Sequence, residues 1–131
     1  MDVALGSMLL ALLLVPATRV LRESRTLAHR LDVRESLLFQ AERTIEATKV
    51  TLSEPAAFAS ALSGAVTIQP NPGAEYPGVQ SQITLTVDRS VPGSTNLITI
   101  NVQTWQDVDG DNRIDQDEPV EQLRTQWGPP Q

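Results

Sequence analysis

Acidic side chains recur at regular spacing in residues 107 to 118, near the end of the chain. The segment is DVDGDNRIDQDE, and the carboxylates at its first, third, fifth, ninth and twelfth positions belong to Asp107, Asp109, Asp111, Asp115 and Glu118. The seventh residue, Arg113, offers a backbone carbonyl oxygen, and the hydrophobic eighth residue is Ile114. Alternating acidic residues on a tight loop bring their oxygens to one hard cation. The spacing therefore predicts a calcium-binding loop with the five carboxylates and the Arg113 carbonyl as ligands.

The loop departs from the common calcium-loop pattern at its sixth position, which is Asn112 instead of glycine. Asparagine tolerates the left-handed backbone conformation that this position requires. The residues before the loop have strand character and Pro119 follows it at once, so we expect an EF-hand-like loop within a hairpin. Zinc is disfavoured because the chain has no cysteine and a single histidine, His29. A solvated acidic turn without a metal is the alternative interpretation.

Charge is divided unevenly between the two halves of the chain, whose net charge is −6. Residues 2 to 49 contain seven Lys or Arg and six Asp or Glu, a balance of +1, whereas residues 54 to 131 contain three against ten, a balance of −7. An acidic C-terminal half argues against nucleic-acid binding, which depends on Lys and Arg at phosphates. The sequence offers no Ser/His/Asp or Cys/His set and no glycine-rich phosphate loop, so we expect no enzymatic activity.

Residues 3 to 18, VALGSMLLALLLVPAT, contain no charged side chain. As a helix they extend about 24 Å, which is somewhat less than the ~30 Å hydrocarbon core of a bilayer. A secretory signal peptide has a similar apolar run, but Met1 and Asp2 supply no basic segment before it and no clear cleavage site follows it. We therefore expect residues 1 to 25 to form a retained membrane or filament-core half of a helix.

The chain continues from the apolar run into residues 19 to 52 without a glycine or asparagine that would stop a helix. Hydrophobic residues recur there every seven positions, at Leu31, Leu38, Ile45 and Leu52. This pattern predicts one continuous amphipathic helix, and Pro55 ends it or lies just beyond its end. A coiled coil is the alternative explanation of the repeat. Arg34 and Thr48 interrupt its second apolar position, which favours packing against a sheet.

Hydrophobic and polar residues alternate in three segments after the helix, at residues 64 to 69, 81 to 88 and 96 to 105. Alternation with Val, Ile and Thr is typical of half-buried strands. Residues 121 to 127 fit either a helix or a strand, and we favour a strand that pairs with residues 97 to 105 across the acidic loop. The predicted fold class is α+β: a long N-terminal helix whose C-terminal half packs on three or four antiparallel strands, with residues 26 to 131 as the globular domain.

A membrane-length apolar helix start, an uninterrupted amphipathic second half and a small antiparallel sheet together resemble the type IV pilin superfamily, which includes the pseudopilins of type II secretion. The resemblance covers the whole chain. Family precursors have a short basic leader ending in Gly, then a mature start of the form Phe-Thr-Leu-x-Glu before the apolar helix. Met1-Asp2-Val3 looks like the end of that start, with Asp2 in the place of the glutamate. We therefore expect a leader upstream of Met1, or a trimmed sequence.

The resemblance implies a structural role. Many copies would self-assemble through their N-terminal helices into a type IV pilus-like or pseudopilus filament, with other pilin-like subunits and a membrane assembly platform as partners. Asp2 would pair with the N-terminal amine of a neighbouring subunit, because a lone carboxylate in hydrocarbon costs on the order of 3 kcal/mol. The chain would cross the inner membrane once, with its globular domain outside the cytoplasm.

Arg19, Arg22 and Arg25 follow the apolar run directly, and positive side chains tend to stay on the cytoplasmic side of a membrane. The pilin-like orientation needs the opposite side, and a basic leader upstream would restore the balance. The alternative function is a monomeric, membrane-anchored calcium-binding module that does not polymerise. Asp2 distinguishes the two hypotheses, since only the filament needs its charge.

Overall fold

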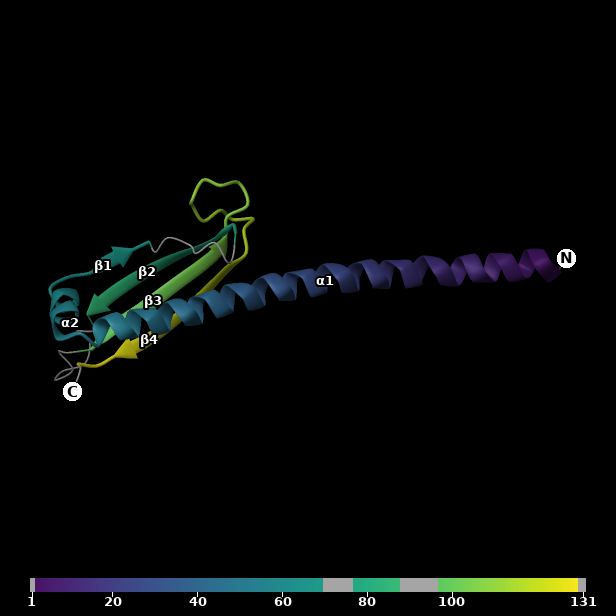
Figure 1. Cartoon of the computed structure of the whole chain (residues 1–131). Helices are drawn as coiled ribbons and strands as arrows, with labels where there is room; N and C mark the ends of the chain where they lie inside the picture. The colour runs from purple at the N-terminus through teal and green to yellow at the C-terminus, as the bar shows by residue number, and fades with distance from the viewer. Residues whose placement is uncertain (1, 70–76, 88–96, 130–131) are drawn as a thin grey trace. The chain divides into compact units, whose positions relative to one another are not determined.

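The computed structural model describes residues 2–69, 77–87 and 97–129, without the side chain of Asp2. Along the chain, the elements are the helices α1 (Asp2–Leu52) and α2 (Pro55–Leu62) and the strands β1 (Val66–Ile68), β2 (Val79–Val87), β3 (Ile98–Gln106) and β4 (Val120–Trp127) (Figure 1). A long helix followed by an antiparallel sheet confirms the predicted α+β class.

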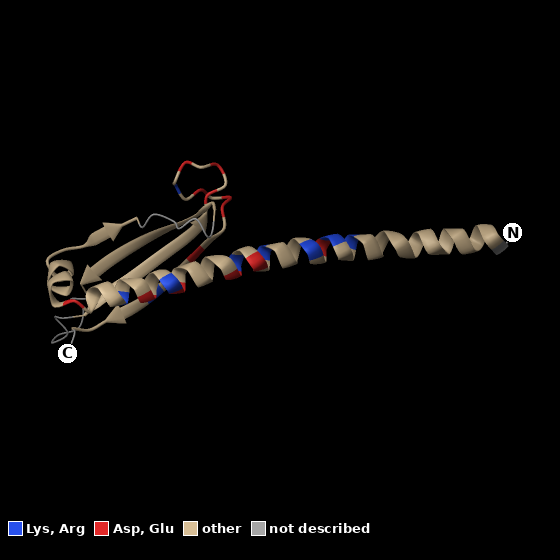
Figure 2. Ribbon diagram, viewed as in Figure 1, with Lys and Arg blue, Asp and Glu red and all other residues tan. Residues whose placement is uncertain are grey.

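The chain forms two compact units, Met1–Val33 and Arg34–Gln131. The described part of the first unit is helical throughout, and the helix continues past Pro16. Its apolar side chains are open to the surroundings, from 87% exposed at Val3 to 55% at Val15. Along the ribbon in Figure 2, the stretch of α1 that follows its grey N-terminal end contains no basic or acidic residue, and a mixture of both kinds comes after it. The predicted functional division at residue 25 stays a prediction.

In the second unit, the last turns of α1 run along one face of the sheet (Figure 1). The buried side chains of this part of the helix follow helical spacing, at Leu37, Ala41, Thr44, Ile45, Thr48 and Leu52. The two threonines are compatible with burial because each hydroxyl donates to a carbonyl one turn back, Thr44 to Gln40 and Thr48 to Thr44. The predicted packing against a sheet is therefore observed.

The buried stripe differs in phase from the predicted seven-residue repeat. Ile45 and Leu52 are buried as expected, but Leu38 is only half-buried and Leu31 is exposed. A seven-residue repeat drifts by about 20° per repeat around a straight helix, so Leu38 is rotated relative to Ile45 and Leu52. Leu31 belongs to the first unit. Leu37 takes the core position that the repeat gave to Leu38.

The four strands form one antiparallel sheet in the order β1-β2-β3-β4, so each strand pairs with its neighbour in sequence. Each of the four predicted strand segments contains a strand, including the ambiguous last one. The first strand is shorter than predicted, since it covers only Val66–Ile68 of residues 64 to 69. Residues 88 and 96, at the ends of two predicted segments, lie outside the described residues. Alternate residues of the central strands face α1 and form the core, among them Ile83, Leu85, Ile98, Ile100 and Val102.

Helix α2 was not predicted. Pro55 lies just beyond the end of α1, as expected, and it also starts a second helix of eight residues, PAAFASAL. Proline suits the first position of a helix because the backbone N–H that it lacks would be unpaired there. Phe58 and Ala61 join the core from this helix. Eight residues are too short a window for apolar periodicity to identify them as a helix.

One rung of the β3–β4 hairpin holds α1 near the start of the second unit. Thr104 and Glu121 are partners in the ladder. The buried Thr104 hydroxyl donates to the backbone carbonyl of Leu37 at 2.9 Å, and the Glu121 carboxylate pairs with the Arg34 guanidinium at 2.7 Å. The ion pair is largely exposed on its arginine side and contributes at most about 1 kcal/mol. The buried hydrogen bond is the more specific contact.

Replacing Thr104 by valine removes this hydroxyl and keeps the shape of the side chain. The Leu37 carbonyl accepts its intrahelical bond in any case, so we expect a loss of about 1 kcal/mol in the free energy of unfolding, the net value of one hydrogen bond. Urea unfolding followed by the fluorescence of Trp105 and Trp127 measures it. The matched control is Thr86→Val on the exposed side of β2, where a change within about 0.5 kcal/mol is expected. Equal losses in both variants would show that the Leu37 contact contributes nothing specific.

Candidate metal centre

The acidic loop joins β3 to β4 and is fixed at its two ends. The backbone N–H of Gln106 donates to the carbonyl of Pro119 at 3.1 Å, which closes the hairpin. The next N–H, that of Asp107, donates to the carbonyl of Gly78 at 2.7 Å, just before β2 begins. In Figure 2 the loop lies at the end of the sheet, and several of its residues are coloured as acidic. The sheet therefore positions the first predicted ligand through backbone contacts on two sides.

Asp107 organises the first half of the loop with both of its carboxylate oxygens. Oδ1 accepts from the N–H of Gly110 at 2.8 Å, and Oδ2 accepts from the N–H of Asn112 at 3.1 Å. The residue is only 9% exposed, unlike most of the loop. These bonds curl the chain around one carboxylate, as a loop that surrounds a cation requires.

The backbone at the sixth loop position has the predicted left-handed conformation. Asn112 has a φ of 59°, the one positive φ among the described residues other than glycine. Gly110, two residues earlier, has a φ of 80°. The sharp turn that glycine normally provides at this position is therefore made by asparagine, which tolerates the conformation better than other side chains.

Asp109 and Asp111 each accept a hydrogen bond from the backbone two residues later. The N–H of Asp111 donates to Asp109 Oδ1 at 3.2 Å, and the N–H of Arg113 donates to Asp111 Oδ1 at 2.7 Å. Hydrogen bonds of this kind, from a nearby backbone N–H to a short acidic side chain, stabilise a turn. The structure thus shows the Arg113 N–H within the loop network, while the ligand role predicted for its carbonyl stays a prediction.

Glu118, at the twelfth position, connects the end of the loop to its beginning. Its Oε1 accepts from the N–H of Val108 at 2.8 Å, and its Oε2 accepts from the N–H of Asp115 at 3.3 Å. The N–H of Glu118 in turn donates to the Asp115 carbonyl at 3.2 Å. The last predicted carboxylate therefore lies beside the first ligands, despite the proline that follows it.

The five predicted carboxylates form two overlapping groups. Asp107, Asp109 and Glu118 make one group, and Asp109, Asp111 and Asp115 make the other. Within each group the ligand oxygens lie within 4.8 Å of one another, and Asp109 belongs to both. The acidic cluster could therefore hold a metal ion. Its donors are all oxygens, which suit hard cations such as calcium, magnesium or manganese and not metals that need thiolates or imidazoles.

The charge of the cluster is evident at Asp109. The N–H of Asp111 donates to this carboxylate and by itself lowers its pKa, but partial desolvation, the charges of Asp111 and Asp115 and a hydrogen bond with Asp107 act in the opposite direction. The net result is a pKa above the ordinary value of 3.8. Partial desolvation and the neighbouring carboxylates thus make ionisation of Asp109 less favourable than usual, and a cation bound among the carboxylates would offset their repulsion.

The predicted residues fall into two groups according to what the structure describes. The five carboxylates of the loop are brought together, whereas the side chain of Asp2 lies outside the described residues. Sequence reasoning missed the part played by Gly78, whose carbonyl holds the N–H of Asp107. The Pro77-Gly78 pair signals a turn. No local signal says that this turn meets a loop about thirty residues later.

A second candidate functional region is the start of α1. From Val3 onward this helix is long and apolar enough to cross a membrane, and none of its most apolar stretch is buried in the protein. This apolar stretch is therefore not part of the hydrophobic core among the residues that the structure describes. Length and composition allow it to span a bilayer with some help from the flanking residues.

The chain matches no protein-family model. No significant match was found among curated proteins or among solved structures.

Proposed function

We propose that this chain is a structural subunit of a type IV pilus-like or type II secretion pseudopilus filament, stored in the membrane before assembly. The observation that supports this most is the division of α1. Its C-terminal part is buried on a sheet through Leu37, Ala41 and Ile45, while its N-terminal part exposes apolar side chains in every direction. One helix thus contains a segment with a core of its own and a segment without one.

The exposed half of α1 needs a cover other than water. Large apolar residues there expose more than half of their surface, including Leu5, Met8, Leu9, Leu10, Leu12, Leu13 and Leu14. Fully burying one such side chain contributes about 1.5–3 kcal/mol. Because the apolar residues surround the helix and do not form one stripe, a single flat partner would leave part of them exposed. A bilayer and a bundle of identical helices are two environments that cover all sides.

The second unit supports the same proposal because it has its own hydrophobic core. Buried residues of the sheet, α1 and α2 pack together, and the polar loop and acidic charge of this unit suit an aqueous compartment. A small α+β domain on the end of a membrane-length helix is the arrangement that the resemblance to pilins implies. In the proposed filament, Asp2 pairs with the N-terminal amine of the next subunit.

We further propose that the acidic cluster binds calcium. The five carboxylates, the left-handed Asn112 and the return of Glu118 to the loop start all agree with an EF-hand-like calcium site. The Arg113 carbonyl would supply the sixth ligand. Bound calcium would neutralise carboxylate repulsion and hold the β3–β4 hairpin closed, which is a structural role.

A shearing experiment tests the filament proposal. Cells that express the chain together with its natural genomic neighbours are sheared, and the released material is sedimented and probed for the chain. We expect the chain in the sheared, sedimentable fraction as well as in the membrane. Recovery in the membrane alone, under conditions where the neighbouring genes are expressed, would favour the monomeric calcium-binding module instead.

A further inference from the structure

The first polar turns of α1 contain a concentration of arginine. Four arginines lie between residues 19 and 30, at Arg19, Arg22, Arg25 and Arg30, against a single carboxylate, Glu23. All five side chains are exposed. Among the residues that the structure describes, none forms an ion pair with any of these arginines. Their charge is therefore available to an external partner.

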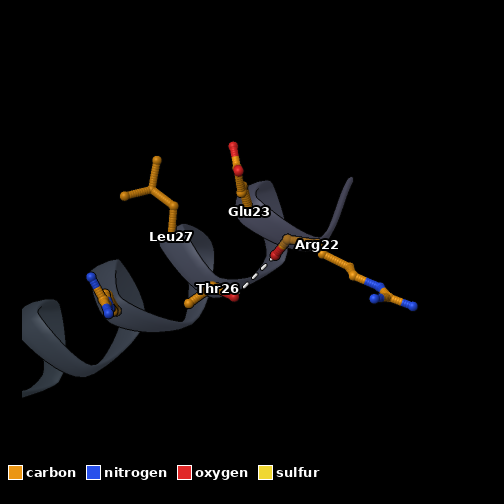
Figure 3. A pocket seen from close by; sticks show the side chains of 5 residues that line it. Arg22, Glu23, Thr26 and Leu27 are labelled. Atoms are coloured by element: carbon orange, nitrogen blue, oxygen red, sulfur yellow. Dashed lines mark hydrogen bonds between the residues drawn. The ribbon is translucent and has the colours of Figure 1, made fainter. Parts of the chain in front are cut away.

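Figure 3 shows that Glu23 does not neutralise its neighbour Arg22. The two side chains leave the helix in different directions, and Glu23 points the same way as Leu27. The Thr26 hydroxyl donates to the backbone carbonyl of Arg22 at 3.0 Å. This bond involves the backbone of Arg22 and not its guanidinium group.

Position along the helix places three of the arginines at the depth of lipid headgroups. Arg19 follows directly after the uncharged run, and Arg25 lies about 9 Å further along the axis at 1.5 Å per residue. The polar layer on each side of a bilayer is about 5–8 Å thick, and long arginine side chains can lean toward it. Arg30 lies about 16 Å beyond Arg19, outside that layer.

An apolar groove leads along the helix to Arg19. Its lining residues are Met8, Ala11, Leu12, Val15, Pro16 and Arg19. At about 100° per residue, Arg22 lies on the same side of the helix as this groove. From Met8 to Arg19 the groove extends about 16 Å, which matches the ~15 Å hydrocarbon half of a bilayer. Small Ala11 leaves room between larger neighbours.

We propose that this surface binds an anionic phospholipid, with an acyl chain along the groove, the phosphate between the guanidiniums of Arg19 and Arg22, and the guanidinium of Arg25 at the side of the headgroup. The inference rests on the membrane anchoring in the proposed function and names the lipid that the anchored subunit prefers. Arginine forms paired hydrogen bonds with phosphate oxygens. A zwitterionic lipid also has a phosphate, but its own positive group competes with arginine for it, so the anionic lipid should bind better. The negative headgroup also offsets the positive flank next to the apolar run.

The test uses the full chain in phosphatidylcholine vesicles with a trace of spin-labelled lipid, either phosphatidylglycerol or phosphatidylcholine. The fraction of each label immobilised by the protein gives its relative association. We expect phosphatidylglycerol to associate at least about fivefold more strongly, the factor supplied by one arginine at an anionic surface. The variant R19Q/R22Q/R25Q should reduce the preference nearly to one. Arg30→Gln, the same change outside the headgroup layer, should keep it.

Two outcomes would overturn the proposal: equal association of the two lipids with the wild type, or a preference that survives in the triple variant. If Arg30→Gln loses the preference for phosphatidylglycerol as fully as the triple variant does, the preference comes from overall charge, and the proposed site is wrong. If inorganic phosphate removes the preference at an ionic strength where chloride does not, the arginines bind free phosphate and the lipid assignment is wrong.

Flotation of the chain with vesicles separates this inference from the membrane proposal. A wild type that does not float contradicts membrane anchoring, whereas one that floats without lipid preference contradicts only the lipid site. Should the triple glutamine variant fail to insert, R19K/R22K/R25K keeps the charge and removes the guanidinium fork, and we expect it to lose at least half of the preference. An unchanged preference in the lysine variant would contradict phosphate binding by the fork.

Discussion

Calcium is expected to raise the melting temperature of the sheet-containing unit by more than 10 °C at saturating concentration. A ligand that binds only the folded state stabilises it by RT ln(1 + [L]/Kd), about 2.7 kcal/mol at a hundredfold excess over Kd. For a domain of 60–100 residues, each kcal/mol shifts the melting temperature by about 4–8 °C. Sites of the extracellular kind bind calcium at roughly 0.1–1 mM. Thermal melts followed by tryptophan fluorescence, with calcium and with chelator, measure the shift.

The position of the loop is the reason that we expect bound calcium to stabilise the whole unit. Its two ends are joined by the bond between Gln106 and Pro119, and Thr104 and Glu121 on the adjacent part of the hairpin hold α1. A loop opened by carboxylate repulsion weakens the same end of the sheet. Six carboxylates and one arginine in residues 107 to 118 give the empty loop a charge of −5, which favours opening.

The informative variant pair removes charge from the site and preserves most of its turn contacts. Asp107→Asn with Asp111→Asn keeps the oxygens that accept from Gly110 and Arg113 and loses only the bond from the N–H of Asn112. The fold should therefore persist, at a cost of about 1 kcal/mol, while the calcium shift disappears. Asp117→Asn is the control, because Asp117 lies in neither carboxylate group. Magnesium should produce a much smaller shift because it demands a tighter, regular octahedron. The same melting temperature with calcium and with chelator in the wild type would show that the cluster is a solvated turn.

Asp2→Ala is expected to abolish incorporation of the chain into sheared filaments while leaving membrane insertion intact. In the proposed filament the Asp2 carboxylate offsets a neighbour's amine, and a charge left unpaired in the apolar interior costs several kcal/mol. Removal of the carboxylate makes insertion easier, since the remaining segment has no charged side chain up to Arg19. Immunoblots of the sheared and membrane fractions measure both effects.

The control for this variant is Glu54→Ala, which removes an exposed carboxylate between the two helices of the second unit. We expect it to assemble normally. If Asp2→Ala enters the sheared fraction as efficiently as the wild type, Asp2 has no part in assembly. If both variants fail, the defect reflects net charge and not a specific pair.

Local patterns predicted the elements that depend on local chemistry. Alternation of Ile83, Leu85 and Val87 identified β2, and the spacing of Asp107, Asp109 and Asp111 identified a loop whose carboxylates do converge. These features depend on periodicity and on side chains that bond to their own backbone within a few residues. The sequence alone was therefore sufficient for the fold class and for the membership of the acidic cluster.

The features that escaped prediction depend on distant partners. Which side of α1 is buried is decided by the sheet, so Leu37 is in the core where the repeat indicated Leu38. The bond from Thr104 to Leu37 joins residues 67 positions apart, and nothing in the neighbourhood of either residue indicates it. The carbonyl of Gly78 meets Asp107 only because β2 and β3 are paired. Such contacts follow from register and packing, which local pattern does not determine.

The most direct measurement of the central claim is the number of neighbours that the exposed half of α1 touches in the assembled state. The chain has no cysteine, so Leu10→Cys with Leu12→Cys introduces two thiols, on opposite sides of the helix, at positions where the native side chains are 62% and 63% exposed. In a filament each subunit is linked to two different neighbours, and a thiol cross-linker should produce a ladder of multimers in the sheared fraction that is absent in an Asp2→Ala background. Monomers and dimers alone, in the wild-type background, would contradict packing of this helix among copies of itself.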